Sequence, residues 1–368
     1  MHAYLKERKR LPVLLVIDSV LLILGIASLA VYYLLRARPE VADAVSSAFS
    51  GPVGDMLSRI SDKVPFSIAE LIYAVGIIFV IFHVIYAIIR IKRSYFRLWE
   101  FLHRLFILLI VVVFLWSLYG WLWGIEYYSE SFSEQTGIPK VAPADVNDLF
   151  KVTAMFLVAS NALSTEVARD ADGHFAEDID EMFDRAPTLY DNIKKIYPCL
   201  EGECYRPNAM VFSKIMSVMG FTGLYFPFTG ESNINVDVPS SFIPATVAHE
   251  LAHQLGYASE QECNFIGILA CIASDDTVYQ YSGYMRGLLY LMNALYASNY
   301  DAWKYLRGYF TAELEQDWKD NSEYWAKFES PIDGFFEKVY DMYLKGNGQT
   351  MGIYSYEACV TMLVEYFK

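Results

Sequence analysis

Residues 249–264 read HELAHQLGYASEQECN, and the expected fold is organised around this stretch. His249 and His253 are four residues apart, so on an α-helix their side chains lie on one face and can reach the same metal ion. Glu250 points to the neighbouring side, where a carboxylate can take a proton from a water molecule activated by zinc. The pattern therefore predicts that His249 and His253 bind Zn²⁺ and that Glu250 is the catalytic base.

The residues that follow predict a turn and a second helix. Gly256 suits a left-handed turn at the end of the first helix. Ser259 and Glu262 have the spacing of a capping box, which places the start of a second helix near Ser259. Glu260 falls in the first turn of that helix, and Asn264 lies one turn further along the same face. An oxygen ligand from the second helix would complete a three-ligand zinc site with one open position.

This stretch resembles the gluzincin class of zinc peptidases, in which the pattern Glu-x-x-x-(Asp/Asn) follows the two histidines. The resemblance implies that Glu260 is the third zinc ligand and that Asn264 orients a ligand histidine. Glu262 is the alternative third ligand, although the expected capping box already gives it a structural role.

The first third of the chain is strongly apolar and predicts a membrane domain. Of the 368 residues 55% are hydrophobic, the mean hydropathy is +0.25, and apolar runs cover about 11–35, 66–89 and 101–125. Each run is long enough to cross a bilayer as a helix. We therefore expect a membrane domain, 1–125, embedded in lipid, and a second domain, 126–368.

Charge distribution predicts the orientation of these spans. Basic segments at 6–10 and 90–104 are expected in the cytoplasm, because short loops rich in Lys and Arg stay inside. Three crossings then place residues 126–368 outside. Residues 1–125 carry 13 basic and 8 acidic side chains, and the rest of the chain carries 16 basic and 35 acidic ones. Because residues 126–368 are strongly acidic, they would repel the phosphates of a nucleic acid, which argues against such a partner.

The second domain is expected to be α+β and mostly helical. Short β-like runs at 211–212, 224–226 and 233–238 predict a small antiparallel sheet just before the histidine helix. Cys199 and Cys204 bracket a loop-like run, and an oxidising space would allow a disulfide between them. Three residues after the motif are candidates to stabilise an oxyanion: Tyr281, Tyr284 and Arg286.

Runs across nearly the whole chain resemble a family of uncharacterised bacterial membrane proteins with a zincin-like domain. The matching runs are residues 223–231, 249–264, 281–284, and 343–349 with 355–356. Cys263 is a departure, because that family usually has alanine there. The resemblance implies the three-span architecture and the zinc site, and it names no reaction.

The expected function is that of a membrane-anchored zinc metallopeptidase that hydrolyses peptide bonds of a peptide or protein substrate outside the cytoplasm. The alternative is a zinc-containing membrane sensor or binding protein without hydrolytic activity. Glu262 as a fourth ligand would favour that alternative, since purely structural zinc sites are usually closed by four protein ligands. A structural membrane protein without metal is the third possibility.

Overall fold

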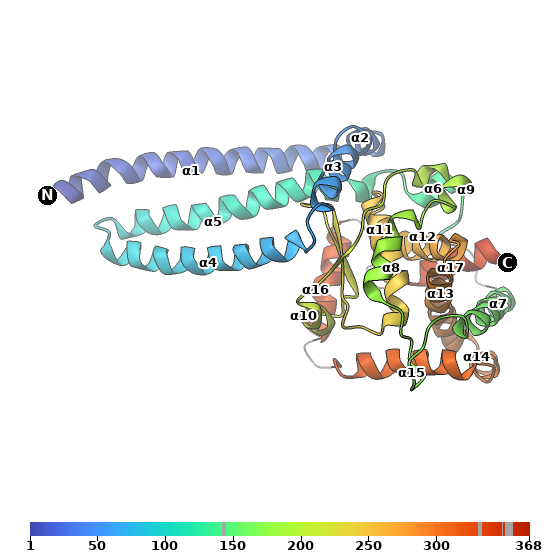
Figure 1. The fold of residues 1–368 in the computed structure, drawn as a ribbon. Helices are drawn as coiled ribbons and strands as arrows, with labels where there is room; N and C mark the ends of the chain where they lie inside the picture. Colours follow the sequence, from blue (N-terminus) through green and yellow to red (C-terminus); the bar gives the residue numbers. More distant parts are fainter. Residues whose placement is uncertain (142–144, 330–332, 348, 350–355) are drawn as a thin grey trace. The chain divides into compact units, whose positions relative to one another are not determined.

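The computed structural model describes residues 1–141, 145–329, 333–347, 349 and 356–368, and these are mostly helical, with one small sheet (Figure 1). The chain forms two compact units. The first unit contains residues 1–53 and 68–129, and the second contains residues 54–67 and 130–368.

The first unit is built on three long helices, α1 (His2–Leu35), α4 (Ile68–Arg93) and α5 (Arg97–Tyr119). By length and composition they provide three candidate membrane spans, Tyr4–Leu35, Ile68–Arg93 and Arg97–Gly124, which agree with the three predicted apolar runs. The shorter elements of this unit are α2 (Pro39–Val45), η1 (Ser46–Ser50), the start of α3 (Gly51–Ser61), η2 (Gly120–Gly124) and η3 (Glu126–Tyr128).

A buried carboxylate joins the three long helices at one end. The side chain of Glu100 on α5 is fully buried and forms ion pairs with Arg10 of α1 at 3.1 Å, Arg90 of α4 at 3.2 Å and Arg104 of α5 at 2.7 Å. The Glu100 carboxylate thus pairs with one arginine from each of the three helices, and these ion pairs offset the free-energy cost of burying its charge.

The second unit places its helices around α11 (Ile243–Gln254), which is buried along most of its length. Its neighbours α12 (Glu260–Ala273) and α13 (Thr277–Ser298) are also largely buried. The remaining elements are α6 (Phe132–Thr136), α7 (Val146–Ser164), α8 (Ile179–Arg185), η4 (Ala186–Thr188), α9 (Ile193–Ile196), η5 (Pro198–Leu200), α10 (Ser213–Val218), η6 (Ser240–Phe242), α14 (Tyr300–Arg307), α15 (Ala312–Ala326), α16 (Asp333–Gly346) and α17 (Tyr356–Phe367).

The sheet has the strand order β1-β3-β2, with β3 (Glu231–Ile234) in the centre. Strand β2 (Gly223–Phe226) pairs with β3 in the antiparallel direction, whereas β1 (Asn208–Ala209) pairs with it in parallel. The expected all-antiparallel sheet is therefore wrong for one pair. Residues 211–212 are also not a strand, because the chain turns there into α10, whose serines form interior hydrogen bonds.

Residues 54–67, which lie between the first two candidate spans in sequence, belong to the second unit. The hydroxyl of Ser58 donates to the carbonyl of Gly230 at 2.8 Å, and that of Ser61 donates to the carbonyl of Thr229 at 2.7 Å. A Cβ on Gly230 would lie 2.3 Å from the Ser58 hydroxyl, so this close approach requires glycine. These bonds fix α3 to the turn between β2 and β3.

We expect the double substitution Ser58→Ala and Ser61→Ala to destabilise the second unit. Ser61→Ala removes the side-chain donor to the buried Thr229 carbonyl, at a cost of about 1–3 kcal/mol. Ser58→Ala removes one of two donors to the Gly230 carbonyl, which keeps its bond from Gln254, so this change costs less. Urea unfolding of the detergent-solubilised protein measures the loss. Ser298→Ala is the control, because that hydroxyl is exposed and bonds only to its own helix. Equal midpoints for the double variant and the control would contradict this role of α3.

Candidate metal centre

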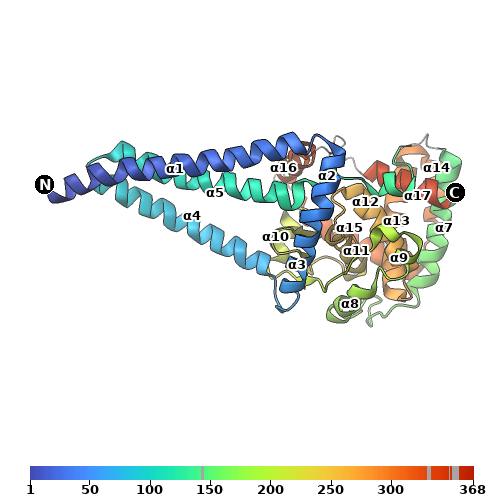
Figure 2. The ribbon, with the colours of Figure 1, turned by 90° about the horizontal axis from the view of Figure 1, so that it is seen from above.

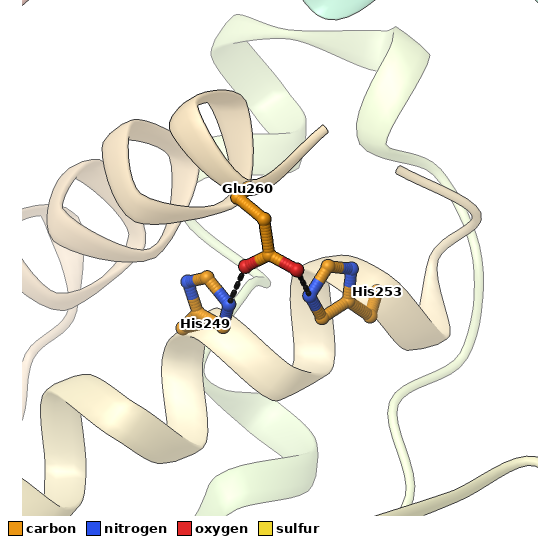
Figure 3. Close-up of side chains that lie close together, drawn as sticks. All are labelled: His249, His253 and Glu260. Atoms are coloured by element: carbon orange, nitrogen blue, oxygen red, sulfur yellow. Dashed lines mark ion pairs between the residues drawn. The ribbon is translucent and has the colours of Figure 1, made fainter. Parts of the chain in front are cut away.

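A close helix crossing creates the candidate metal centre. Helix α11 begins with Pro244 in its first turn and carries His249 and His253 on one face, with ring centroids 4.8 Å apart. On α12, Gly267 packs directly against α11, since a Cβ there would lie 2.9 Å from the backbone nitrogen of His249. This approach brings Glu260, at the start of α12, over the two imidazoles (Figure 3).

The three side chains present their ligand atoms to a common point. The Nε2 atom of His249 lies 3.2 Å from one Glu260 oxygen, and Nε2 of His253 lies 3.7 Å from the other. All three ligand atoms lie within 4.8 Å of one another. Ligands about 2.0–2.1 Å from a tetrahedral zinc ion sit roughly 3.3 Å apart. The two Nε2–oxygen distances are near this value, and the widest separation would have to shorten by about 1.5 Å to hold such an ion.

The second nitrogen of His253 is held by the turn that follows α11. Its Nδ1 atom lies 2.7 Å from the carbonyl of Tyr257, so Nδ1 carries the proton and leaves Nε2 as the ligand atom. The thiol of Cys263 donates to the same carbonyl at 3.0 Å. Gly256, with φ of +96°, makes the predicted left-handed turn that returns Tyr257 to the histidine. The sequence predicted the turn, but it did not predict that the carbonyl of Tyr257 would hold His253.

Electrostatics favour an ionised Glu260. Burial raises the pKa of this carboxyl, but His253 and His249 outweigh burial, so the pKa lies well below its usual range. An ionised carboxylate beside two imidazoles is a donor set suited to a divalent cation such as zinc.

Glu250 lies outside the ligand cluster, against the edge strand β2. The backbone N–H of Tyr225 donates to its carboxyl, whereas Oε2 is buried and has no hydrogen-bond partner among the described residues. Burial raises the pKa of Glu250, and the neighbouring histidines only partly oppose this. A Cβ on Gly223 would lie 2.4 Å from the other carboxyl oxygen, so a larger residue there would displace this side chain.

The alternative ligand Glu262 is held elsewhere. Its carboxylate accepts the backbone N–H of Ser133 at 2.8 Å and pairs with Lys140 at 3.0 Å. The expected capping box is therefore wrong: α12 does begin after Ser259, but the hydroxyl of Ser259 makes no hydrogen bond to a described residue. Because these partners hold Glu262 away from the histidines, the structure selects Glu260 for the cluster.

The predicted supporting residues form other contacts. Asn264 does not reach a ligand histidine, because its Oδ1 atom accepts from the hydroxyl of Tyr290 at 3.1 Å. Tyr281 donates to Asp317, and Tyr284 packs edge-on against an aromatic ring of α7.

The third oxyanion candidate, Arg286, is also engaged. Its guanidinium donates to the hydroxyl of Thr246 at 3.0 Å and covers the ring of Phe242. These bonds tie α13 to the first turns of α11, and they give no support to the predicted role of the three residues at an oxyanion.

The predicted disulfide is absent from the structure, where Cys199 and Cys204 are both free cysteines. Cys199 is partly exposed in the short helix η5, whereas Cys204 is buried in the extended segment that follows. Burial raises the pKa of the Cys204 thiol to about 12, which keeps it protonated and unreactive.

Comparison with known families places the chain. A family model described as a protein of unknown function, DUF3810, matches residues 47–364, which include two of the three candidate spans and the whole metal cluster. The chain belongs to the DUF3810 family. No curated protein and no solved structure matches it. Membership thus supports the layout and leaves the chemistry to be argued from the residues.

We expect Glu260→Gln to weaken zinc binding by more than about 100-fold, because removing a ligand costs more than the 10–100-fold typical of supporting residues. Glu262→Gln is the matched control, since it alters a neighbouring carboxylate outside the cluster and should leave zinc affinity nearly unchanged. Competition with a zinc chelator on the purified proteins measures both affinities. If Glu262→Gln loses the metal and Glu260→Gln keeps it, the assignment of the third ligand is wrong.

Proposed function

We propose that this protein is a membrane-anchored zinc metallopeptidase that hydrolyses peptide bonds outside the cytoplasm. The observation that carries the proposal is the cluster of His249, His253 and Glu260 beside Glu250, a buried carboxyl with one oxygen that has no partner in the part of the chain that the structure describes. Three ligands leave one coordination position for water or substrate, which is typical of catalytic zinc sites rather than structural ones.

In the proposed hydrolysis, the metal and Glu250 have different roles. When bound there, zinc supplies Lewis-acid polarisation of the scissile carbonyl and acidifies a water molecule. Glu250 accepts the proton of the attacking water at its unpartnered oxygen and passes it to the leaving amine. Its raised pKa brings the carboxyl closer to the operating pH, which makes both transfers easier.

Strand β2 supports a peptide substrate. The N–H of Asn235 donates to the carbonyl of Thr222 at 2.9 Å, so the alternate residues Gly223 and Tyr225 turn their backbone groups to the opposite edge. The Tyr225 N–H at that edge meets Glu250. An extended peptide that adds to this edge would bring its backbone past the base, whatever its side chains.

We expect Glu250→Gln to retain zinc and abolish hydrolysis, because glutamine keeps the size of the side chain but cannot accept the proton. His253→Ala should lose the metal. Zinc content and cleavage of a fluorogenic peptide library by the full-length protein measure the two effects. Unchanged cleavage by Glu250→Gln would refute the mechanism, and zinc-loaded wild-type protein without hydrolysis would favour the sensor alternative.

A second variant tests the placement of the same base. Gly223→Ala should displace the Glu250 carboxyl and reduce hydrolysis while zinc stays bound, since its Cβ would lie only 2.4 Å from that carboxyl. Gly308→Ala is the control, because a Cβ there would make only ordinary contacts, the nearest at 3.4 Å. Equal activity of the two variants would contradict the close packing of β2 on Glu250.

The basic segments at 6–10 and 90–104 support placing the second unit outside the cytoplasm. Protease added to intact spheroplasts should then digest residues 130–368. Full protection of this region until the cells are lysed would overturn the orientation, without bearing on the zinc chemistry.

A further inference from the structure

Helix α10 (Ser213–Val218) has its polar and apolar sides reversed for a helix in water. Its two serines face the interior: Ser213 donates to the carbonyl of Met210 at 2.7 Å, and Ser217 accepts from the side chain of Asn235 at 2.9 Å. Ile215 and Val218 on the helix, and Met219 just after it, are 57%, 44% and 36% exposed. In water this arrangement forgoes about 25 cal/mol for each Å² of apolar surface left exposed.

Helix α16 extends the apolar surface of α10. The rings of Phe221, just after α10, and Tyr340, on α16, pack edge-on with centroids 5.2 Å apart. Both helices lie at the same side of the second unit in two perpendicular views (Figures 1 and 2). Val339 and Met342 on α16 are also exposed. We name the set Ile215, Val218, Met219, Val339 and Met342 the α10–α16 face.

Three exposed lysines lie on the same two helices as this face, in a unit that is otherwise acidic. Lys214 on α10 and Lys338 and Lys345 on α16 are exposed. At about 100° per residue, each lysine lies roughly 40–60° around its helix from Val218 or Met342. From this position a long side chain can reach past an apolar surface toward charged headgroups. Apolar side chains rimmed by lysine are typical of segments that lie in a membrane interface.

The α10–α16 face is connected to a candidate span through a short stretch of the second unit. The α3 segment, bonded to the turn at Thr229 and Gly230, continues through Phe66, which is 54% exposed, directly into the candidate span α4. The same turn ends β2, a strand of four residues about 13 Å long, and α10 is joined to its other end. If α4 spans the membrane, the leaflet that the chain enters at Ile68 is thus within reach of α10.

From these observations we infer that the α10–α16 face rests in the headgroup and upper acyl region of the leaflet that the chain enters at Ile68. The lipid surface is its partner, with lysines toward the headgroups and the apolar side chains below them. This docking is independent of metal binding and of the proposed peptidase activity.

The test uses the full-length protein, one copy per nanodisc, in a Cys199→Ser background, because Cys199 is the one cysteine that is not buried. An environment-sensitive fluorophore is attached to Ile215→Cys. The matched control is Val158→Cys, which replaces an apolar residue that is 69% exposed on α7, at the far side of the second unit (Figure 1).

We expect lipid-borne quenchers to reduce the emission at position 215 and not at 158, and aqueous iodide to do the reverse. Adding Val218→Gln and Met219→Gln should abolish lipid quenching at 215, while an unchanged unfolding midpoint shows that the unit is intact. Iodide quenching at both positions would overturn the inference. Protection of position 215 from both quenchers would also overturn it, since another protein surface would then cover the face.

Discussion

The close crossing of α11 and α12 at Gly267 is the contact on which the candidate site depends. Because a Cβ there would press on the backbone of His249, the two helices can approach only with glycine at this position. The approach sets the start of α12 over the histidine face, so Glu260 meets both imidazoles. A pair of helices packed by larger side chains, at the usual separation of about 8–10 Å, would hold this carboxylate farther from the histidines.

The three acidic residues near the histidines have different surroundings. Glu260 is stabilised as an anion by the histidines, whereas Glu250 is buried against β2 with a raised pKa and one oxygen that no described residue contacts by a hydrogen bond. Glu262 is neutralised by Lys140 and by a backbone N–H. Three carboxyl groups within thirteen residues thus have different environments. The proposed hydrolysis would use this difference, with Glu260 as ligand, Glu250 as base and Glu262 as a structural anion.

The segment between the first two spans connects the membrane anchor to this arrangement. Serines of α3 bond to the turn that joins β2 to β3, and β2 in turn packs on Glu250. The end of α11 joins the same turn, because Gln254 donates to the Gly230 carbonyl at 3.0 Å. A residue pair far apart in sequence, Ser58 and Gly230, therefore belongs to the scaffold of the site, and the second unit is complete only with residues 54–67.

The sequence by itself determined the three apolar runs, the histidine face of α11 and the turn at Gly256, because each depends on local periodicity or on the conformational freedom of one glycine. The sequence left Glu260 and Glu262 as competing candidates for the third ligand. It also predicted that Asn264 contacts a histidine, whereas Asn264 bonds to Tyr290. It also joined two cysteines that the structure keeps apart, and it read residues 211–212 as a strand. Only the tertiary structure decided these points. A carboxylate takes its role from the charges and donors that other segments bring to it, such as Lys140 and Ser133 for Glu262, and sequence spacing along one helix carries no information about them.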